Sequence, residues 1–238
     1  MLDGGDRAHW VPPEVISKMS SRSSVPFNPA VHHARDTSGQ RATRVVTKPA
    51  AAYRQRANRG GGGVPYNAPE VWHEPHGRGA LTIAIQPAGI DYMHPVTEAE
   101  VRERLAQLPR QYTRDLEVVQ LSRMTRKRRT FPCYGMQWGQ SVYLYPIESN
   151  LVELYSVPPK PAQQIEARMF GATWAQCENY WTLTWTLESI KDFYLNNVLI
   201  HEVGHLNDPR NTTYRERERY ANWFAIEYGY RVSRGRKS

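Results

Sequence analysis

Residues 201–205 read His-Glu-Val-Gly-His, a spacing at which the two histidine side chains lie on the same face of a helix. The imidazoles of His201 and His205 can therefore reach one metal ion and leave a coordination position open for water. Glu202 lies beside the first histidine, where its carboxylate can take a proton from that water. The pattern predicts a hydrolytic metal centre with Glu202 as the general base. The competing interpretation is a charged face on an ordinary helix.

The segment before this motif has the features of a helix that would carry it. Residues 186–200 contain neither glycine nor proline, and Thr186 is a suitable N-cap. An apolar face repeats at helical spacing and comprises Leu195, Leu199, Val203 and Leu206. A second face comprises Tyr194, Asn197, His201 and His205. We expect the first face to pack in the core, the second to carry the ligands, and the helix to end at Asp208-Pro209.

A third ligand is expected from the next segment. Thr213 and Glu216 match a capping box, so a second helix should begin at Thr213. One face of this helix comprises Glu218, Ala221, Asn222 and Ala225. The alanines would let the two helices approach closely, so that the Glu218 carboxylate reaches the metal. Asn222, one turn later, would fix a ligand histidine through its amide. Glu216 and Asp208 are rival carboxylates, but capping and helix termination explain them better.

The two helical motifs together resemble those of a known family. A His-Glu-x-x-His helix followed by Glu-x-x-Ala-Asn-x-Phe-Ala over residues 218–225 is similar to the gluzincin metallopeptidases. The likeness is greatest to their small intracellular members, including the repressor-cleaving peptidases of mobile elements. The resemblance implies one Zn²⁺ ion as cofactor, with Glu218 as its third ligand. Residues 134–146 also resemble the strand that precedes the active-site helix in this family, whereas residues 148–184 have no recognised counterpart.

The fold that this resemblance implies is α+β and zincin-like, with a small mixed β-sheet packed on an active-site helix and a second ligand-bearing helix. The order of the predicted elements agrees with that architecture. A helix is expected to begin at the capping box of Thr97 and Glu100. Strands are expected at residues 80–85, 116–121 and 141–145, and a further hairpin within residues 163–185.

The chain divides into three parts. Residues 1–76 are rich in proline, glycine, serine and arginine without sustained apolar periodicity, so we expect a basic, disordered N-terminal extension. Residues 77–232 are expected to form the zincin-like metallopeptidase domain, and residues 233–238 a basic tail. Neither a signal peptide nor a membrane span is recognisable, which predicts a cytoplasmic protein without a membrane partner. Two cysteines, Cys133 and Cys177, do not make a disulfide framework.

Basic residues exceed acidic residues by 31 to 23, giving a formal net charge of +8. The excess gathers in a predicted basic turn, residues 123–129, and in the C-terminal tail. Contact with nucleic acid is one interpretation of this charge. A solvated turn and a frayed tail are favoured, because aromatic side chains are not interleaved with the charges.

The activity expected from these motifs is hydrolysis of a peptide or protein substrate, with Glu202 as the general base. The oxyanion that forms needs a further donor, for which Tyr214, Tyr228 and Tyr230 are the candidates. Residues 141–145 are expected to be an edge strand that binds an extended peptide by strand addition. Two alternatives stay open: a catalytically idle zincin-fold protein that binds a partner, and a DNA-associated protease that acts on nucleic-acid-bound proteins.

Overall fold

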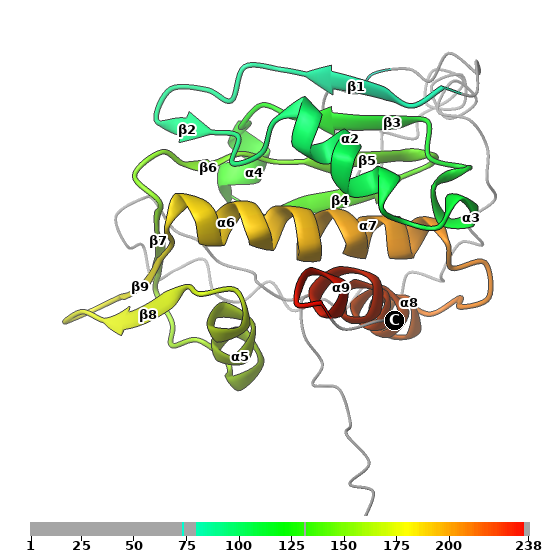
Figure 1. The fold of residues 1–238 in the computed structure, drawn as a ribbon. Coiled ribbons are helices and arrows are strands. Elements are labelled where there is room, and N and C mark those ends of the chain that lie inside the picture. The colour runs from blue at the N-terminus through cyan, green and yellow to red at the C-terminus, as the bar shows by residue number, and fades with distance from the viewer. Residues whose placement is uncertain (1–72, 74–79, 131, 236–238) are drawn as a thin grey trace, which may run out of the picture.

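The computed structural model describes His73 and residues 80–130 and 132–235. The predicted N-terminal extension therefore lies outside the described residues except for His73, whose backbone N–H donates to Gln120 Oε1 at 2.9 Å. Of the predicted basic tail, residues 233–235 are described. The described chain is mixed α+β, with small sheets and several helices, as the sequence predicts (Figure 1).

The main sheet has four strands in the order β1-β3-β5-β4. They are β1 Thr82–Ile85, β3 Val118–Leu121, β5 Ser141–Leu144 and β4 Gly135–Trp138. The first three run parallel, and β4 is antiparallel to β5 through a turn at Gly139, whose φ is +61°. A strand does form at Ser141–Leu144, but its prediction as the sheet edge is wrong, because the turn folds β4 against its outer side.

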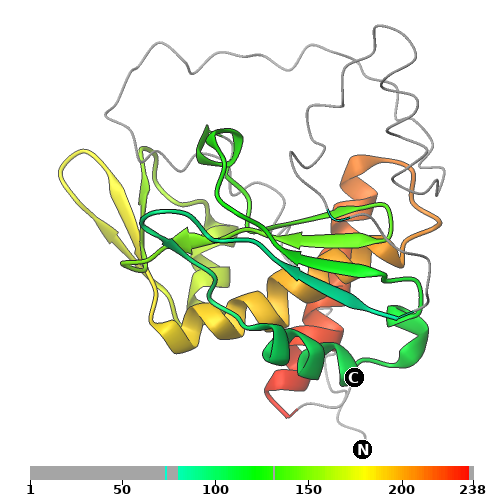
Figure 2. The ribbon, with the colours of Figure 1, turned by 90° about the horizontal axis from the view of Figure 1, so that it is seen from above.

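Three helical segments form one continuous rod against a face of this sheet. They are α6 Leu187–Phe193, the π-helix η2 Tyr194–Val198 and α7 Leu199–Leu206. The rod runs beneath the green strands in the view from above (Figure 2). Its N-terminus is capped as predicted, since the backbone N–H of Ser189 donates to Thr186 Oγ1 at 3.1 Å. Helix α2, Glu98–Ala106, lies on the same side and begins at the predicted capping box of Thr97 and Glu100.

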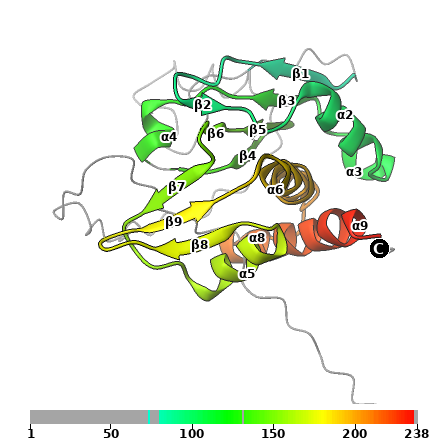
Figure 3. The ribbon, with the colours of Figure 1, turned by 60° about the vertical axis from the view of Figure 1, so that its left-hand side comes forward.

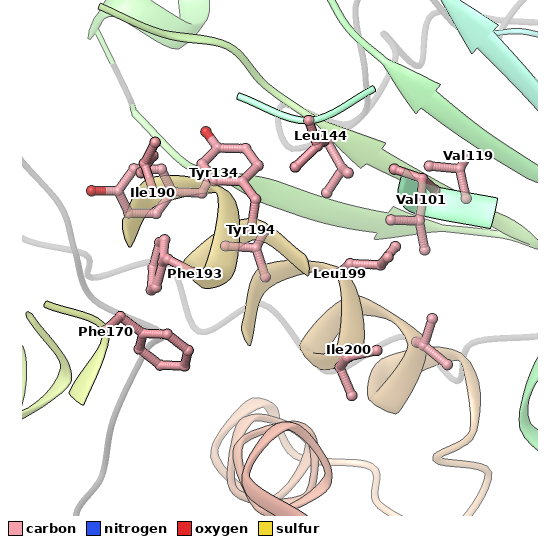
Figure 4. Close-up of a cluster of buried hydrophobic side chains, with 14 of the residues drawn as sticks. Val101, Val119, Tyr134, Leu144, Phe170, Ile190, Phe193, Tyr194, Leu199 and Ile200 are labelled. Atoms are coloured by element: carbon pink, nitrogen blue, oxygen red, sulfur yellow. The ribbon is translucent and has the colours of Figure 1, made fainter. Parts of the chain in front are cut away.

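The core fills the space between the rod and the sheet (Figure 4). Alternate strand residues such as Val119 and Leu144 face the rod, because successive side chains of a strand point to opposite faces. Leu199, at the start of α7, is fully buried there, whereas the fully buried Ile200 points toward the helical segment that contains Gly229. The ligand-bearing helix therefore rests on a packed apolar floor.

A second rod crosses α7 and is built in the same way. It comprises α8 Tyr214–Phe224, the π-helix η3 Ala225–Tyr230 and α9 Arg231–Ser233. Helix α8 begins where the sequence predicts, and the backbone N–H of Glu216 donates to Thr213 Oγ1 at 3.3 Å. The short helix α3, Arg110–Thr113, connects α2 to β3.

The part of the chain that follows the main sheet in sequence and precedes the first rod forms a smaller layer beside that rod (Figure 3). Its three-stranded sheet has the order β7-β9-β8 and is accompanied by one helix. These elements are β7 Val152–Tyr155, α5 Pro161–Met169, β8 Thr173–Gln176 and β9 Trp181–Thr184. The hairpin predicted within residues 163–185 is confirmed. A short ladder, β2 Tyr92–Met93 with β6 Ile147–Glu148, completes the described strands.

The predicted basic turn at residues 123–129 is partly a helix. Residues Arg126–Thr130 form α4, and Arg128 within it is buried rather than solvated. The side chains that bury Arg128 are Cys133, Met136 and Tyr145. They lie outside this helix, so the pattern of charges in the segment cannot predict the burial of Arg128.

The π-helix η2 explains why one predicted helix face does not continue to the metal ligands. A π-turn closes its hydrogen bond one residue later than an α-turn, so it shifts the spacing of all following side chains. Tyr194 and Asn197, predicted to share a face with the histidines, are instead engaged in the interior. The Tyr194 hydroxyl donates to the Tyr145 carbonyl at 2.6 Å, and Asn197 Nδ2 donates to Glu166 Oε1 at 2.7 Å.

Arg104 of α2 holds the two π-helices together. Its Nε donates to Asn196 Oδ1 at 2.6 Å, and its Nη2 donates to the carbonyl of Tyr228. The rods are in direct contact at Gly229, where an added Cβ would come within 2.0 Å of the Asn196 carbonyl oxygen. Burial lowers the pKa of Arg104 to about 10. One buried side chain thus ties together the helices that carry the candidate ligands.

Glu166 gives a testable pH dependence of stability. Its side chain is 2% exposed, and burial raises its pKa to about 7 although the hydrogen bond from Asn197 lowers it. Because the unfolded carboxyl ionises near 4.5, stability falls as the pH rises from about 4.5 to about 7, and the loss is complete above that range. Glu166→Gln keeps the acceptor oxygen and removes the ionisation, so its stability relative to wild type should rise by on the order of 2–3 kcal/mol between pH 4.5 and pH 8. Thermal denaturation at the two pH values measures this difference, and parallel behaviour of the two proteins would contradict it.

Candidate metal centre

His201 and His205 on α7 converge with Glu218 on α8. Nε2 of His201 lies 3.5 Å from Glu218 Oε2, and Nε2 of His205 lies 3.5 Å from Glu218 Oε1. One ligand atom of each residue lies within 4.8 Å of the other two. Ligands bound to zinc at tetrahedral angles lie about 3.4 Å apart. Two imidazoles and one carboxylate at this spacing therefore fit a single zinc ion.

Small residues let the two ligand helices approach this closely. A Cβ added to Gly204 would lie 3.0 Å from the Ala221 Cα and 3.0 Å from the Phe224 Cβ. Ala221 and Ala225 are fully buried, as expected for the face that packs on the helix with the two histidines. Gly204 is one of the two variable positions of the pentapeptide, so here a variable position sets the distance between the helices.

Glu218 is held as a carboxylate by the two histidines. Burial acts to raise its pKa, but hydrogen bonds and charge interactions with His201 and His205 outweigh burial and lower the pKa to about 2. An ionised carboxylate between two imidazoles is the charge state that a metal ligand requires. The structure brings together the three ligands that the sequence and its family resemblance indicate.

The rival carboxylates have other roles. Glu216 is exposed in the first turn of α8, where its Oε2 accepts from the Thr213 hydroxyl at 2.7 Å. Asp208 accepts from Asn211 through the backbone N–H at 3.2 Å and the side-chain Nδ2 at 2.9 Å. Capping and helix termination, the roles expected from the sequence, account for both residues.

Glu202 lies directly against strand β4. A Cβ added to Gly135 would lie 3.0 Å from Glu202 Oε1, so the glycine lets the strand approach this carboxylate. Burial raises the pKa of Glu202 to about 7, and the nearby Glu218 adds to this effect. The charge of His201 and a hydrogen bond with the Gln137 backbone act in the opposite direction. A carboxylate with an increased proton affinity beside the three ligands is suited to act as a base.

Gly135 was not singled out from the sequence as a site residue, and its absence of a side chain can be tested. A Cβ there would also lie 2.7 Å from Val198 Cγ1 at the end of η2, so Gly135→Ala must displace the side chain of Val198 or of Glu202, or the strand itself. We expect a loss of stability of about 1–3 kcal/mol and reduced hydrolysis. Melting temperature and turnover measure the two effects. Gly139→Asn is the control, because an added Cβ meets nothing within 4 Å and asparagine tolerates the positive φ; equal damage by both changes would contradict the expectation.

The hydrogen bond predicted for Asn222 is not present. Asn222 is 9% exposed on α8, but its Oδ1 has no hydrogen-bond partner among the described residues. The Nδ1 atoms of His201 and His205 also have none there. Both imidazole rings point Nε2 at Glu218. The Asn222 side chain does not form a hydrogen bond with the Nδ1 atom of either ring. The structure does not support Asn222 as the residue that fixes a ligand histidine.

The three tyrosines proposed as oxyanion donors differ in their surroundings. The Tyr228 hydroxyl forms a 2.8 Å hydrogen bond with the Tyr112 hydroxyl. Tyr230 packs against Phe170 at a centroid distance of 5.4 Å. The described contacts place neither of them against the candidate ligands, and their role as oxyanion donors stays a prediction. Tyr214, exposed and one turn before the ligand glutamate, stays a candidate.

Comparison with known proteins adds no relative. The chain matches no protein-family model, no curated protein and no solved structure. A search of the described helices for membrane spans finds none of sufficient length and apolar character. Any functional assignment therefore depends on the residues and geometry of the chain itself.

Proposed function

We propose that this chain is a zinc-dependent metallopeptidase of the gluzincin type with a zincin-like fold. The observation that carries the proposal is the convergence of His201, His205 and Glu218, with Glu202 buried beside them. A binding protein without activity would have no use for the second carboxylate. The α+β arrangement, in which a mixed sheet packs on the helix that carries both histidines, supports the same proposal.

The residues divide the chemical work. His201, His205 and Glu218 would hold the ion, and when bound, zinc activates water and polarises a carbonyl group. Glu202 would accept a proton from the attacking water and pass it to the leaving amine. Burial, which raises the pKa of Glu202, helps it to hold that proton between the two steps.

Strand β4 offers a place for the substrate backbone. A two-residue turn makes Trp138 and Ser141 a hydrogen-bonded pair, and alternation along the ladder then pairs Met136 with Tyr143. The main-chain groups of Gly135 and Gln137 consequently point away from β5. The Gln137 backbone already engages Glu202, so this edge runs past the general base. An extended peptide that paired with β4 would place its backbone at the metal.

Zinc content and peptidase activity of the purified protein test the proposal together. Mass spectrometry of the native protein should give one zinc per chain, and a proteome-derived peptide mixture should be cleaved. A chelator should stop cleavage, and added zinc should restore it. Zinc without cleavage would favour a catalytically idle binding protein, and absence of both would refute the proposal.

A further inference from the structure

Helix α4 places a buried arginine beside strand β4. Arg128 is 7% exposed, with Nη1 3.1 Å from Cys133 Sγ and Nη2 3.4 Å from Met136 Sδ. Its guanidinium carbon lies 4.3 Å from the centre of the Tyr145 ring. In the part of the chain that the structure describes, the ion pairs formed do not include Arg128. The guanidinium therefore has two sulfur atoms and the Tyr145 ring as direct side-chain partners. The charge of Arg128 acts on the Glu202 carboxylate and opposes the burial that raises its pKa, but the two groups do not form an ion pair.

Burial of a charge without a directly paired opposite charge is unfavourable. Weak sulfur acceptors and a cation–π contact offset only part of the cost of removing the guanidinium from water. A carboxylate that reached Arg128 could accept two parallel hydrogen bonds from the planar guanidinium, which is already removed from water. The surroundings of Arg128 are thus those of an anion site that the described residues leave incomplete.

The position of Arg128 relates it to the proposed substrate path. Met136, which it contacts, directly follows Gly135, the residue that touches Glu202. Side chains alternate along a strand, so Gly135 faces α7 and Met136 faces the opposite side of the sheet, where Arg128 lies. A peptide paired with the edge of β4 alternates in the same way. Every second side chain of that peptide would therefore project toward the side of Arg128.

Further positive charges lie in the same segment as Arg128. Helix α4 has the sequence Arg-Lys-Arg-Arg-Thr and contains no acidic residue, and Arg126 and Arg129 are exposed. Arg123, shortly before it, is exposed as well. Clustered cations raise the local potential and favour the approach of an anionic group.

We propose that Arg128 binds a carboxylate of the substrate, so that the enzyme prefers peptides with an acidic group on the side of β4 where Arg128 lies. This inference rests on the proposed peptidase function. The carboxylate belongs either to an Asp or Glu side chain or to the C-terminus of the peptide. Both present the same two oxygens to the guanidinium, and the experiment below separates them.

Cleavage-site profiling of the zinc-loaded full chain tests the inference. A proteome-derived peptide mixture is digested, and the residues around each cut are counted by mass spectrometry. We expect an acidic group to be enriched at one fixed position from the cut. Arg128→Gln should abolish this enrichment while cleavage continues at other sites. Arg126→Gln removes an exposed charge from the same helix, and it should keep the enrichment at the same position because long-range attraction does not fix that position. Zinc content and melting temperature establish that each variant is folded.

A matched set of peptides tests the same contact without any change to the protein. The best-cleaved sequence is synthesised with Glu or Gln at the enriched position and with a free or amidated C-terminus. The neutral form of the relevant carboxylate should lower kcat/KM of wild type by about 10- to 100-fold, and the affected pair identifies which carboxylate is bound. Cleavage without any acidic preference, or an unchanged preference in Arg128→Gln, overturns the role of Arg128 alone. Absence of all cleavage overturns the peptidase proposal as well.

Discussion

Glu202→Gln is expected to leave zinc bound and to lower the rate of hydrolysis by a factor of about 10²–10⁴, the usual effect of losing a general base. Glutamine has the shape of glutamate and keeps an oxygen that can accept from the Gln137 backbone. It should therefore fit against Gly135, where the space is tightest. Its amide cannot take a proton from water. Zinc content and single-substrate turnover of the purified variant measure the two expectations independently.

The control for this change is Glu216→Gln. Glu216 is an exposed glutamate in the first turn of α8, where it interacts with Thr213 and lies outside the ligand group. Its substitution should alter turnover little. Turnover of Glu202→Gln close to that of wild type would show that another group accepts the proton. Loss of zinc in Glu202→Gln would instead show that Glu202 helps to build the metal site.

The parts of the site that the sequence predicts are those set by local helical geometry. His201 and His205 share a helix face because of their spacing, and Thr213 starts the second helix at the residue where the capping pattern places it. Small residues at the contact then bring Glu218 to the histidines. The spacing of the histidines and the helix start at Thr213 are each encoded within a few neighbouring residues, and the small residues at the helix contact are visible as a pattern along each helix.

The features that the sequence did not predict depend on tertiary contacts. The π-helix η2 interrupts a segment whose residues suit an α-helix, and its spacing follows from packing against η3, with Asn196 facing Gly229. β5 was predicted as the edge strand, but β4 is the edge strand. The difference depends on where the hairpin places β4 relative to β5, which is a tertiary choice. Arg128 reads as one more solvated charge until its surroundings are known. Hydrophobic periodicity carries no information about any of these choices.

Glu218→Ala is expected to reduce zinc affinity by more than about 100-fold, since even a partner outside the ligand set is typically worth ~10–100-fold. The change removes both carboxylate oxygens, each 3.5 Å from one imidazole nitrogen, and leaves two histidines as the ligand set. Chelator competition measures the affinity. Zinc should also raise the melting temperature of wild type, because a ligand that binds the folded state stabilises it by about 2.7 kcal/mol at a hundred times its Kd. The variant should lose that response.

Two further variants decide whether Glu218 is the third ligand or only a neighbour of the site. Asp208→Asn removes the charge of the rival carboxylate at the end of α7, whose present partner is Asn211. Glu216→Ala removes the neighbouring carboxylate of α8 and weakens the helix start without touching the histidines. Both should bind zinc as wild type does. If Glu218→Ala kept full affinity while Asp208→Asn lost it, the third ligand would lie at the end of the active-site helix, and the contact between α7 and α8 would serve packing alone.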